Sequence, residues 1–370
     1  MVVYDYLERM TKTNLRAVNR ELIDLVKKER PKYVVWPTVN YEFLESTFDA
    51  IRKWGTILVG LFFDDEYRFD NYSKYWIPHL DYCVTSEIET VPKYRELGAR
   101  VIHAIPCHGV PIERDWSDIE EKYEVSFVGT RKYDRETYIN QIKEHNIRVH
   151  VVGPGWDKWA SSDEISDIFK CSKINLNFSK TEHNKLGWKG RIFQITNAGG
   201  FLLTEYRPRI ENFFEIDKEI VCFRDGREMV DKILYYLNND KERRAIAQAG
   251  WKRATSQYTP FHMMSRIFDE IESDFAANGR KIDRHSEKLK MPMQIRRLPS
   301  QYYMLWGRAF LLANYSTLWR AALAFSICYY PLNRRAWRYY VLGFLPFCAR
   351  TALIRHYEKL CSRFRAMPPL

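Results

Sequence analysis

Two basic side chains stand close together at the expected start of a helix in the middle of the chain. Lys189 and Arg191 open a segment with helical spacing, residues 189–197, and a polar loop precedes them. Cations and free backbone N–H groups at a helix N-terminus favour negative charge and suit a diphosphate. A Lys-Gly-Arg triplet alone is more often a solvated helix start. The apolar strands expected on either side place this loop at the edge of a sheet and favour the anion site.

Acidic side chains that could accept a proton follow a buried strand nearer the N-terminus. Asp64 and Asp65 come directly after the apolar run 56–63, so we expect them to face a cleft. Paired carboxylates suit general-base chemistry because each tunes the pKa of the other. A cap on the next helix or an ion pair with a nearby arginine explains them equally well. Glu182 and His183, in the polar loop before the basic pair, are similar candidates.

The elements that must position these residues alternate between short apolar strands and amphipathic helices, a pattern typical of parallel sheets with crossover helices. Strands are expected over 33–36, 56–63, 81–85, 101–105, 124–128, 148–152, 174–178 and 200–204, with helices between them and three further helices over 226–238, 241–255 and 260–277. A break rich in Pro, Gly and mixed charge at 106–117 predicts a domain boundary. The fold class is therefore α/β, with two doubly wound domains facing a cleft.

The positive charge of the chain lies at its C-terminal end. The 370 residues include 58 Lys and Arg against 47 Asp and Glu, a formal charge of +11. Residues 281–370 hold 16 basic and three acidic residues, or +13, which leaves 42 basic and 44 acidic residues, or −2, for 1–280. With 46% hydrophobic residues the chain is too apolar for a disordered protein. The seven cysteines are scattered without metal-ligand spacing, so we expect free thiols, and no secretory signal is expected.

The basic tail, residues 281–370, combines 16 aromatic side chains with its arginines. Arginines interrupt each apolar run before it reaches the roughly 18 residues that a membrane span needs. Amphipathic helices over 301–315, 317–330 and 334–345 are expected to lie in the interface of an anionic bilayer. A helical extension packed on the body or on a second subunit stays open as an alternative. Nucleic-acid binding is not expected, because many aliphatic side chains accompany the aromatic ones.

Seven motifs follow one another between residues 126 and 250: Ser126-Phe-Val-Gly-Thr-Arg131, Val151-Val-Gly-Pro-Gly-Trp156, Lys189-Gly-Arg-Ile-Phe193, Ala198-Gly-Gly-Phe-Leu-Leu-Thr-Glu205, Glu219-Ile-Val-Cys-Phe223, Ile233-Leu-Tyr-Tyr-Leu237 and Arg244-Ala-Ile-Ala-Gln-Ala-Gly250. Together they resemble the nucleotide-sugar-binding half of GT-B glycosyltransferases, and most closely the CgeB-like group of bacterial family 1 style enzymes. Asp64-Asp-Glu-Tyr-Arg-Phe69 and Asp81-Tyr-Cys-Val-Thr85 look like the matching N-terminal half. The resemblance covers residues 10–275 or thereabouts.

This resemblance implies a GT-B protein that transfers a sugar from a nucleotide-sugar, the substrate, with no metal or other cofactor, because protein cations neutralise the leaving diphosphate. It implies an acceptor-side domain at 1–115, a donor domain at 120–278 and the tail at 281–370. We expect a glycan or lipid-linked acceptor at the cytoplasmic face of the inner membrane, where the enzyme would be peripheral, and an oligomer stays open. A non-catalytic GT-B-like scaffold protein at the membrane is the alternative.

The resemblance also implies which residues bind the donor. Those near the phosphates, the ribose or the sugar are Gly129, Thr130, Arg131, Lys189, Arg191, Gln194, Gly199, Gly200 and Glu205. Two departures stand out. Gln194 replaces the Glu that usually follows Arg-x-Phe, so the ribose contact lacks a carboxylate. The N-terminal residues lead almost directly into a helix where such domains begin with a buried strand, so either a first strand is missing from the sequence or the first sheet is reduced.

Overall fold

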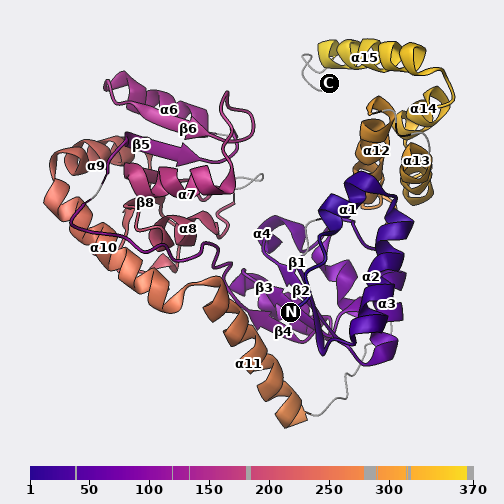
Figure 1. Ribbon diagram of the computed structural model, residues 1–370, viewed down its shortest axis with the longest axis horizontal. Helices are drawn as coiled ribbons and strands as arrows, with labels where there is room; N and C mark the ends of the chain where they lie inside the picture. Colours follow the sequence, from indigo (N-terminus) through magenta and orange to yellow (C-terminus); the bar gives the residue numbers. More distant parts are fainter. Residues whose placement is uncertain are drawn as a thin grey trace.

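The computed structural model forms two α/β units followed by four helices (Figure 1). It describes residues 1–37, 40–118, 120–132, 134–180, 185–278, 289, 291–313, 315 and 318–364, with side chains described as far as residue 356. Six cysteines within these ranges are free thiols, and the four in the two α/β units are buried. None of the described helices is long and apolar enough to cross a bilayer.

The first sheet is parallel and its strands follow the order of the sequence. It consists of β1 (Tyr33–Pro37), β2 (Ile57–Phe62), β3 (Tyr82–Thr85) and β4 (Val101–His103), in the order β1-β2-β3-β4. The helices of this unit are α1 (Tyr6–Lys12), α2 (Leu15–Glu29), α3 (Glu45–Ile51), α4 (Asp65–Arg68) and α5 (Val91–Glu96). All crossovers advance in one direction, so this sheet has no point at which its strand order reverses.

The second sheet is parallel and doubly wound. It consists of β5 (Tyr123–Val128), β6 (Val149–Val152), β7 (Ser172–Asn177), β8 (Leu202–Glu205) and β9 (Val221–Phe223), in the order β6-β5-β7-β8-β9. Its helices are α6 (Arg135–Glu144), α7 (Ser162–Cys171), α8 (Arg191–Asn197), α9 (Gly226–Asn238) and α10 (Asp240–Gln257). The chain leaves β5 toward β6 and returns to the other side at β7. This reversal opens a crevice at the carboxyl ends of β5 and β7, where ligands of such sheets bind.

Helix α11 (Pro260–Asn278) crosses back to the first unit (Figure 1). Ile267 and Ile271 are fully buried against the strand residues Val59 and Val84, on the face of the first sheet opposite α2 and α3. Asp274 accepts a hydrogen bond from the hydroxyl of Tyr82 at 2.5 Å. We expected the second domain to extend to residue 278, but the apolar face of α11 covers the first sheet, which would otherwise be open on that side.

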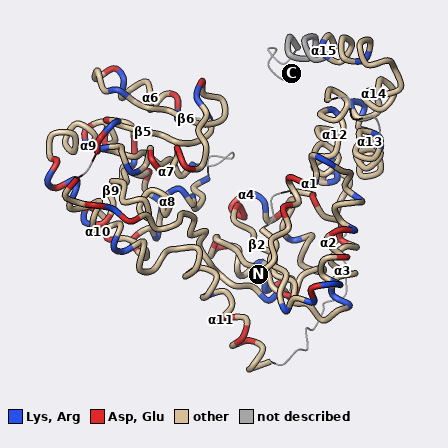
Figure 2. The backbone as a smooth tube through the Cα atoms, viewed as in Figure 1, with Lys and Arg blue, Asp and Glu red and all other residues tan. Residues whose placement is uncertain are grey.

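The tail forms α12 (Arg297–Leu312), α13 (Leu318–Tyr329), α14 (Arg334–Leu342) and α15 (Phe347–Phe364). Helix α12 joins the core of the first unit through Tyr303, whose hydroxyl donates to the carbonyl of Tyr41 at 2.7 Å. Helices α12 and α13 approach closely at Gly307, where an added Cβ would lie 2.5 Å from Leu323 Cγ. The inner tail helices therefore pack on the body, which was one of the open alternatives. Figure 2 shows Lys and Arg along α12–α14 and no Asp or Glu there.

Candidate functional site

A pocket of about 530 Å³ opens at the reversal point of the second sheet. The loops after β5 and β6 form one wall, and the end of β7 with the start of α8 forms the other. Five of the predicted donor-binding residues line it: Gly129, Thr130, Lys189, Arg191 and Gln194. Residues from three separate motifs of the sequence, 126–131, 151–156 and 189–193, thus meet at the place where the sheet topology predicts a ligand.

Glycines allow the two loops of this pocket to touch. Gly153 has φ +132°, and a Cβ at this position would lie 2.6 Å from the carbonyl oxygen of Gly129. The indole of Trp156 donates to the same carbonyl at 2.9 Å. Gly190 plays a similar part at the start of α8, where a Cβ would meet the His108 ring at 2.1 Å. His108, which comes from the linker between the units, also lines the pocket, and burial lowers its pKa.

Arg191 is the buried cation of this pocket. Burial, together with the nearby Arg135, lowers the pKa of Arg191 to about 10. Within the described residues no carboxylate pairs with Arg191. Its guanidinium instead donates to the amide oxygen of Gln194 at 2.8 Å. Since a buried charge is unfavourable unless it is paired, an anionic ligand in this pocket would be favourable. Gln194 holds Arg191 but leaves its positive charge in place, whereas a Glu at this position would neutralise that charge.

A second pocket, of about 450 Å³, lies between the two units. Residues of α4 and of the segment after β3 line it on one side, and Lys185, Leu186 and Arg207 line it on the other. Glu66 lines this pocket, and its Oε1 lies 3.8 Å from Nζ of Lys189, which lines the first pocket. The Glu66–Lys189 pair therefore stands where the two pockets meet.

Glu66 is the acidic residue that the sequence analysis missed. Its side chain is 6% exposed, and neither carboxylate oxygen has a hydrogen-bond partner within the described structure. Burial raises its pKa to about 7, and Lys189 partly counteracts this. A buried carboxyl without hydrogen bonds is rare and calls for an explanation. The signal in the sequence was the third acid of Asp64-Asp-Glu66, which the one-turn helix α4 directs toward the second unit.

The predicted acids Asp64 and Asp65 have different surroundings. Asp65 is buried and lines the second pocket. Its carboxylate accepts hydrogen bonds from the hydroxyls of Ser73 and Tyr94, the latter at 2.8 Å, while burial raises its pKa to about 6. Asp64 precedes α4, and its side chain makes no capping hydrogen bond to that helix. Of the three acids Asp64, Asp65 and Glu66, it is Glu66 that lies beside a cation of the first pocket, Lys189. Glu182 and His183 lie outside the described residues.

The two units are joined beside the second pocket by a buried ion pair. Arg207 Nη2 lies 2.6 Å from Glu87 Oε2, and both side chains are less than 10% exposed. The guanidinium carbon of Arg207 stands 4.1 Å from the centre of the Trp188 ring. A second pair across the units, Arg209 with Glu89 at 2.9 Å, is exposed.

Four predicted donor-binding residues do not line the first pocket. Arg131 forms an exposed ion pair with Glu136. Glu205 is buried, and its carboxylate accepts from the backbone N–H groups of Ser179 and Lys180 at 2.9 and 3.1 Å. Glu205 therefore fixes the backbone where the chain leaves β7. Its carboxylate is engaged by these two N–H groups, whereas the resemblance implied a contact with a donor hydroxyl.

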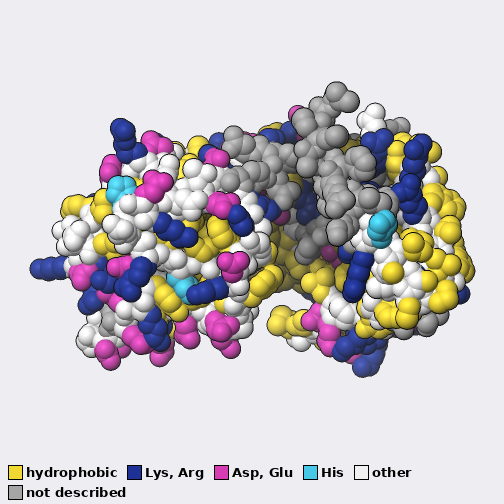
Figure 3. Space-filling model, turned by 90° about the horizontal axis from the view of Figure 1, so that it is seen from above, with side chains coloured by type: hydrophobic (Ala, Val, Ile, Leu, Met, Phe, Trp, Pro, Cys, Tyr) yellow, Lys and Arg dark blue, Asp and Glu magenta, His cyan; other side chains and the backbone are white. Residues whose placement is uncertain are grey.

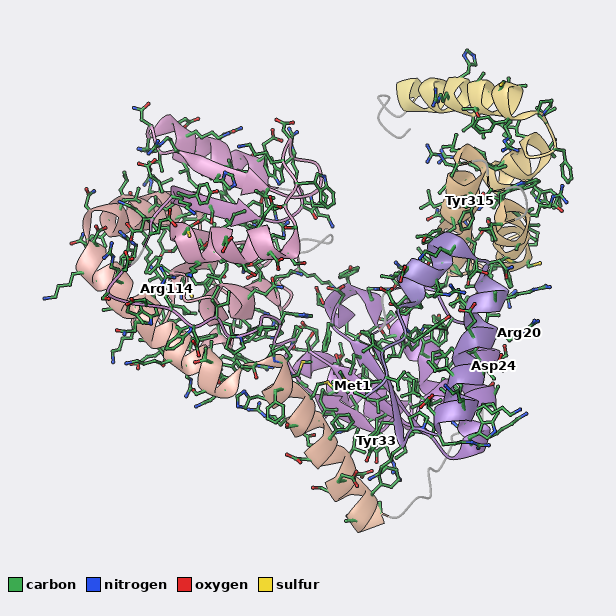
Figure 4. All side chains as sticks on the ribbon, in the orientation of Figure 1. Met1, Arg20, Asp24, Tyr33, Arg114 and Tyr315 are labelled. Carbon is green, nitrogen blue, oxygen red and sulfur yellow. The ribbon has the colours of Figure 1, made fainter. Side chains whose placement is uncertain are left out.

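The glycine pair after α8 is also structural. Gly199 has φ +73°, and its carbonyl accepts a 2.6 Å hydrogen bond from Arg114, labelled in Figure 4. An added Cβ at Gly200 would lie 2.6 Å from both the Asn175 side chain and the Phe169 carbonyl. These glycines let the chain turn and pass close to its neighbours at the far end of α8, away from the pocket.

Comparisons with known proteins agree with the resemblance seen in the sequence. Residues 131–269 match a family model described as "Glycosyl transferase-like". HepE from Anabaena, solved with UDP and glucose, superposes with a TM-score of 0.50 at 10% identity, over 70% of this chain and 82% of HepE. The pneumococcal O-GlcNAc transferase GtfA, solved with UDP and GlcNAc, gives 0.49 at 10% identity, over 68% of this chain and 59% of GtfA. A search of the curated proteins found no match.

At such low identity a structural likeness speaks for the fold alone, and the fold is GT-B. The chain spans about three fifths of the length of GtfA. Among the described residues no group of three or more His, Cys, Asp or Glu side chains is arranged to hold a metal ion.

Proposed function

We propose that this GT-B protein, whose residues 131–269 match the glycosyl transferase-like family, transfers a sugar from a nucleotide-sugar to an acceptor hydroxyl. The observation that carries the proposal is Arg191, a buried guanidinium without a carboxylate partner in the described structure, lining a pocket at the reversal point of the second sheet. Such a pocket suits the diphosphate of a nucleotide-sugar, because a polyanion offsets the unfavourable charge.

In this function the donor diphosphate lies between Lys189, Arg191 and the glycine loops after β5 and β6. The bond between the sugar C1 and the phosphate oxygen breaks, and negative charge grows on the leaving diphosphate. Fixed cations aimed at that charge stabilise the transition state more than the ground state. They supply the electrostatic part that a metal ion supplies elsewhere, so we propose that the reaction needs no metal.

The acceptor hydroxyl would enter from the second pocket and give its proton to Glu66 as its oxygen bonds to C1. Glu66 supports this role by position, since it lines the second pocket and its Oε1 lies 3.8 Å from Nζ of Lys189, which lines the first. Both of its oxygens are without hydrogen bonds in the described structure. A pKa of about 7 suits a general base near neutral pH. Asp65, with its carboxylate bonded to Ser73 and Tyr94, supports the wall of this pocket.

We further propose that the acceptor is a lipid-linked or surface glycan and that the protein works at the cytoplasmic face of the membrane. The basic and aromatic tail supports this, because residues 288–357 contain no Asp or Glu and the outer tail helices expose apolar side chains.

Calorimetric titration with UDP, GDP, CDP, ADP and TDP in the presence of a chelator tests the donor site. We expect one nucleotide to bind the wild type, and Arg191→Ala to weaken it by about 10- to 100-fold, since a charge-assisted hydrogen bond contributes about 1.5–3 kcal/mol. Arg131→Ala, which removes an exposed arginine outside the pocket, is the matched control and should leave the affinity unchanged.

Three outcomes would contradict the proposal: no binding of any nucleotide, equal losses in the two variants, or binding that needs a divalent cation. Mass spectrometry with a panel of glycan acceptors detects any glycosylated product. Nucleotide binding without such a product would favour the scaffold alternative.

A further inference from the structure

A third pocket, of about 570 Å³, lies in the tail between the first turns of α12 and α14. Arg297 reaches it from the start of α12, and Arg334 and Arg335 reach it from the start of α14. A hydrogen bond of 2.8 Å from the Asn333 amide to the Ser300 hydroxyl joins the two helix starts. The pocket thus gathers three arginines around two helix N-termini.

These arginines stand where a helix disfavours positive charge. The N-terminal end of each helix carries the positive end of its dipole, and neither α12 nor α14 has an acid in its first turn. No carboxylate pairs with Arg297, Arg334 or Arg335 in the part of the chain that the structure describes. An anion bound between the helix starts would be attracted by the three guanidinium groups and by the positive ends of the two helix dipoles.

The rim of this pocket is apolar and exposed. Leu332 is 70% and Leu305 is 56% exposed, and both line the pocket. Trp337 and Val341, four residues apart on one face of α14, continue the apolar surface, and Phe344 is exposed just after the helix ends. Figure 3 shows hydrophobic side chains mixed with Lys and Arg at the right-hand end of the molecule. A ligand that fits both parts carries a phosphate and a hydrocarbon chain.

We propose that this pocket binds the phosphate of an anionic phospholipid in a bilayer. The arginines Arg297, Arg334 and Arg335 hold the headgroup, and Leu305 and Leu332 contact the first part of the hydrocarbon. Trp337 and Val341 of α14, with Phe344 after it, lie among the headgroups. The inference rests on the membrane location proposed above and adds the lipid chemistry and the residues that recognise it.

Sedimentation of the full chain with vesicles tests this site. We compare vesicles of phosphatidylcholine alone with vesicles of phosphatidylcholine mixed with phosphatidylglycerol. The wild type should bind the mixed vesicles and not the neutral ones. Arg334→Gln/Arg335→Gln should bind about 25-fold more weakly, because each basic residue near an anionic surface strengthens binding about fivefold. The variant should fold, since it removes cations from a helix start that disfavours them.

The matched control is Arg20→Gln/Arg95→Gln, which removes two exposed arginines from α2 and α5. This variant should keep at least a third of the wild-type affinity. An equal loss in both double variants would mean that net charge alone attracts the bilayer, and would overturn the pocket. Unchanged binding by Arg334→Gln/Arg335→Gln would overturn it too. So would binding of soluble glycerol phosphate without binding to vesicles, which would indicate a free phosphate ligand.

Nucleotide titration of the same variants separates this inference from the donor site. The tail pocket and the donor pocket lie in different parts of the chain, so both double variants should bind the nucleotide as the wild type does. Absence of wild-type vesicle binding would overturn the membrane location together with the lipid site, while leaving the donor site to its own titration.

Discussion

Glu66 and Lys189 face each other across the two α/β units, with Oε1 of the carboxyl 3.8 Å from Nζ of the ammonium group. Glu66 lines the second pocket and lies in α4, which follows β2. Lys189 lines the first pocket and lies just before the start of α8. The pair links a cation of the donor pocket to an acid of the first unit. It places a proton acceptor beside the group that would stabilise the leaving diphosphate.

Replacement of this acid tests its role in proton transfer. Glu66→Gln should lower kcat by about 100-fold or more, the range of general-base catalysis, with little change in KM for the donor. The wild-type rate should rise with pH through an apparent pKa near 7, and this rise should be absent from the variant. Glu89→Gln, an exposed acid of the same pocket, is the control and should keep the wild-type profile. Equal kcat values for Glu66→Gln and wild type would rule Glu66 out as the base.

The same substitution has a signature in stability. The folded-state pKa of Glu66, about 7, lies above the ordinary glutamate pKa of 4.5, so ionisation of Glu66 destabilises the fold. The penalty is absent below pH 4.5, grows between 4.5 and 7, and is complete above that range. At pH values above 7 Glu66→Gln should therefore be more stable than wild type by about 1–3 kcal/mol. Urea unfolding at several pH values measures the difference, which should vanish in acid; a difference independent of pH would contradict the assignment.

The buried ion pair between the units should be important for stability. Arg207→Ala leaves Glu87 buried without its cation, and we expect a loss of about 3–5 kcal/mol in the free energy of unfolding. Arg209→Ala breaks the exposed pair with Glu89 and should lose less than about 1 kcal/mol. Chemical unfolding of both variants makes the comparison. Similarly small losses in Arg207→Ala and Arg209→Ala would mean that water hydrates Glu87 when Arg207 is removed.

Glu205 offers a test between a backbone anchor and a ligand contact. Glu205→Ala leaves the N–H groups of Ser179 and Lys180 without their acceptor and should lower stability by about 2–4 kcal/mol. Thermal unfolding measures this loss. A ligand contact predicts the reverse pattern, with weaker nucleotide binding and unchanged unfolding, and that result would restore the role first expected for Glu205.

The close approach of the two glycine loops makes a further prediction. Gly153→Ala would place a side chain on a backbone with φ +132°, with its Cβ 2.6 Å from the Gly129 carbonyl oxygen. The variant should therefore lose about 1–3 kcal/mol of stability and bind the nucleotide more weakly. Gly98→Ala, at φ +73° in the first unit, imposes similar backbone strain away from the pocket. Calorimetry should show normal nucleotide affinity for Gly98→Ala alone. Equal affinities in both variants would mean that the loops do not form the donor site.

Sequence by itself determined the elements and the donor-side cations. Apolar alternation placed eight of the nine described strands and missed β9. The position of Lys189 and Arg191 after a strand and at a helix start predicted that they would share a site, and both residues line the first pocket. Local rules suffice there, because the carboxyl ends of parallel strands meet at one edge whatever the rest of the fold does. Amphipathic spacing likewise predicted α12, α13 and α14 of the tail but not α15.

Tertiary structure alone decided which side chains meet. Asp65 and Glu66 are adjacent acids of α4, yet Asp65 is bonded within the first unit while Glu66 faces Lys189 of the second. Glu205 stands at a strand end, like a ligand-binding residue, yet its carboxylate serves two backbone groups that are 25 and 26 residues away in the chain. Helix α11 covers the first sheet although it follows the second. Contacts between distant segments depend on how whole units dock, and neither periodicity nor residue type carries that information.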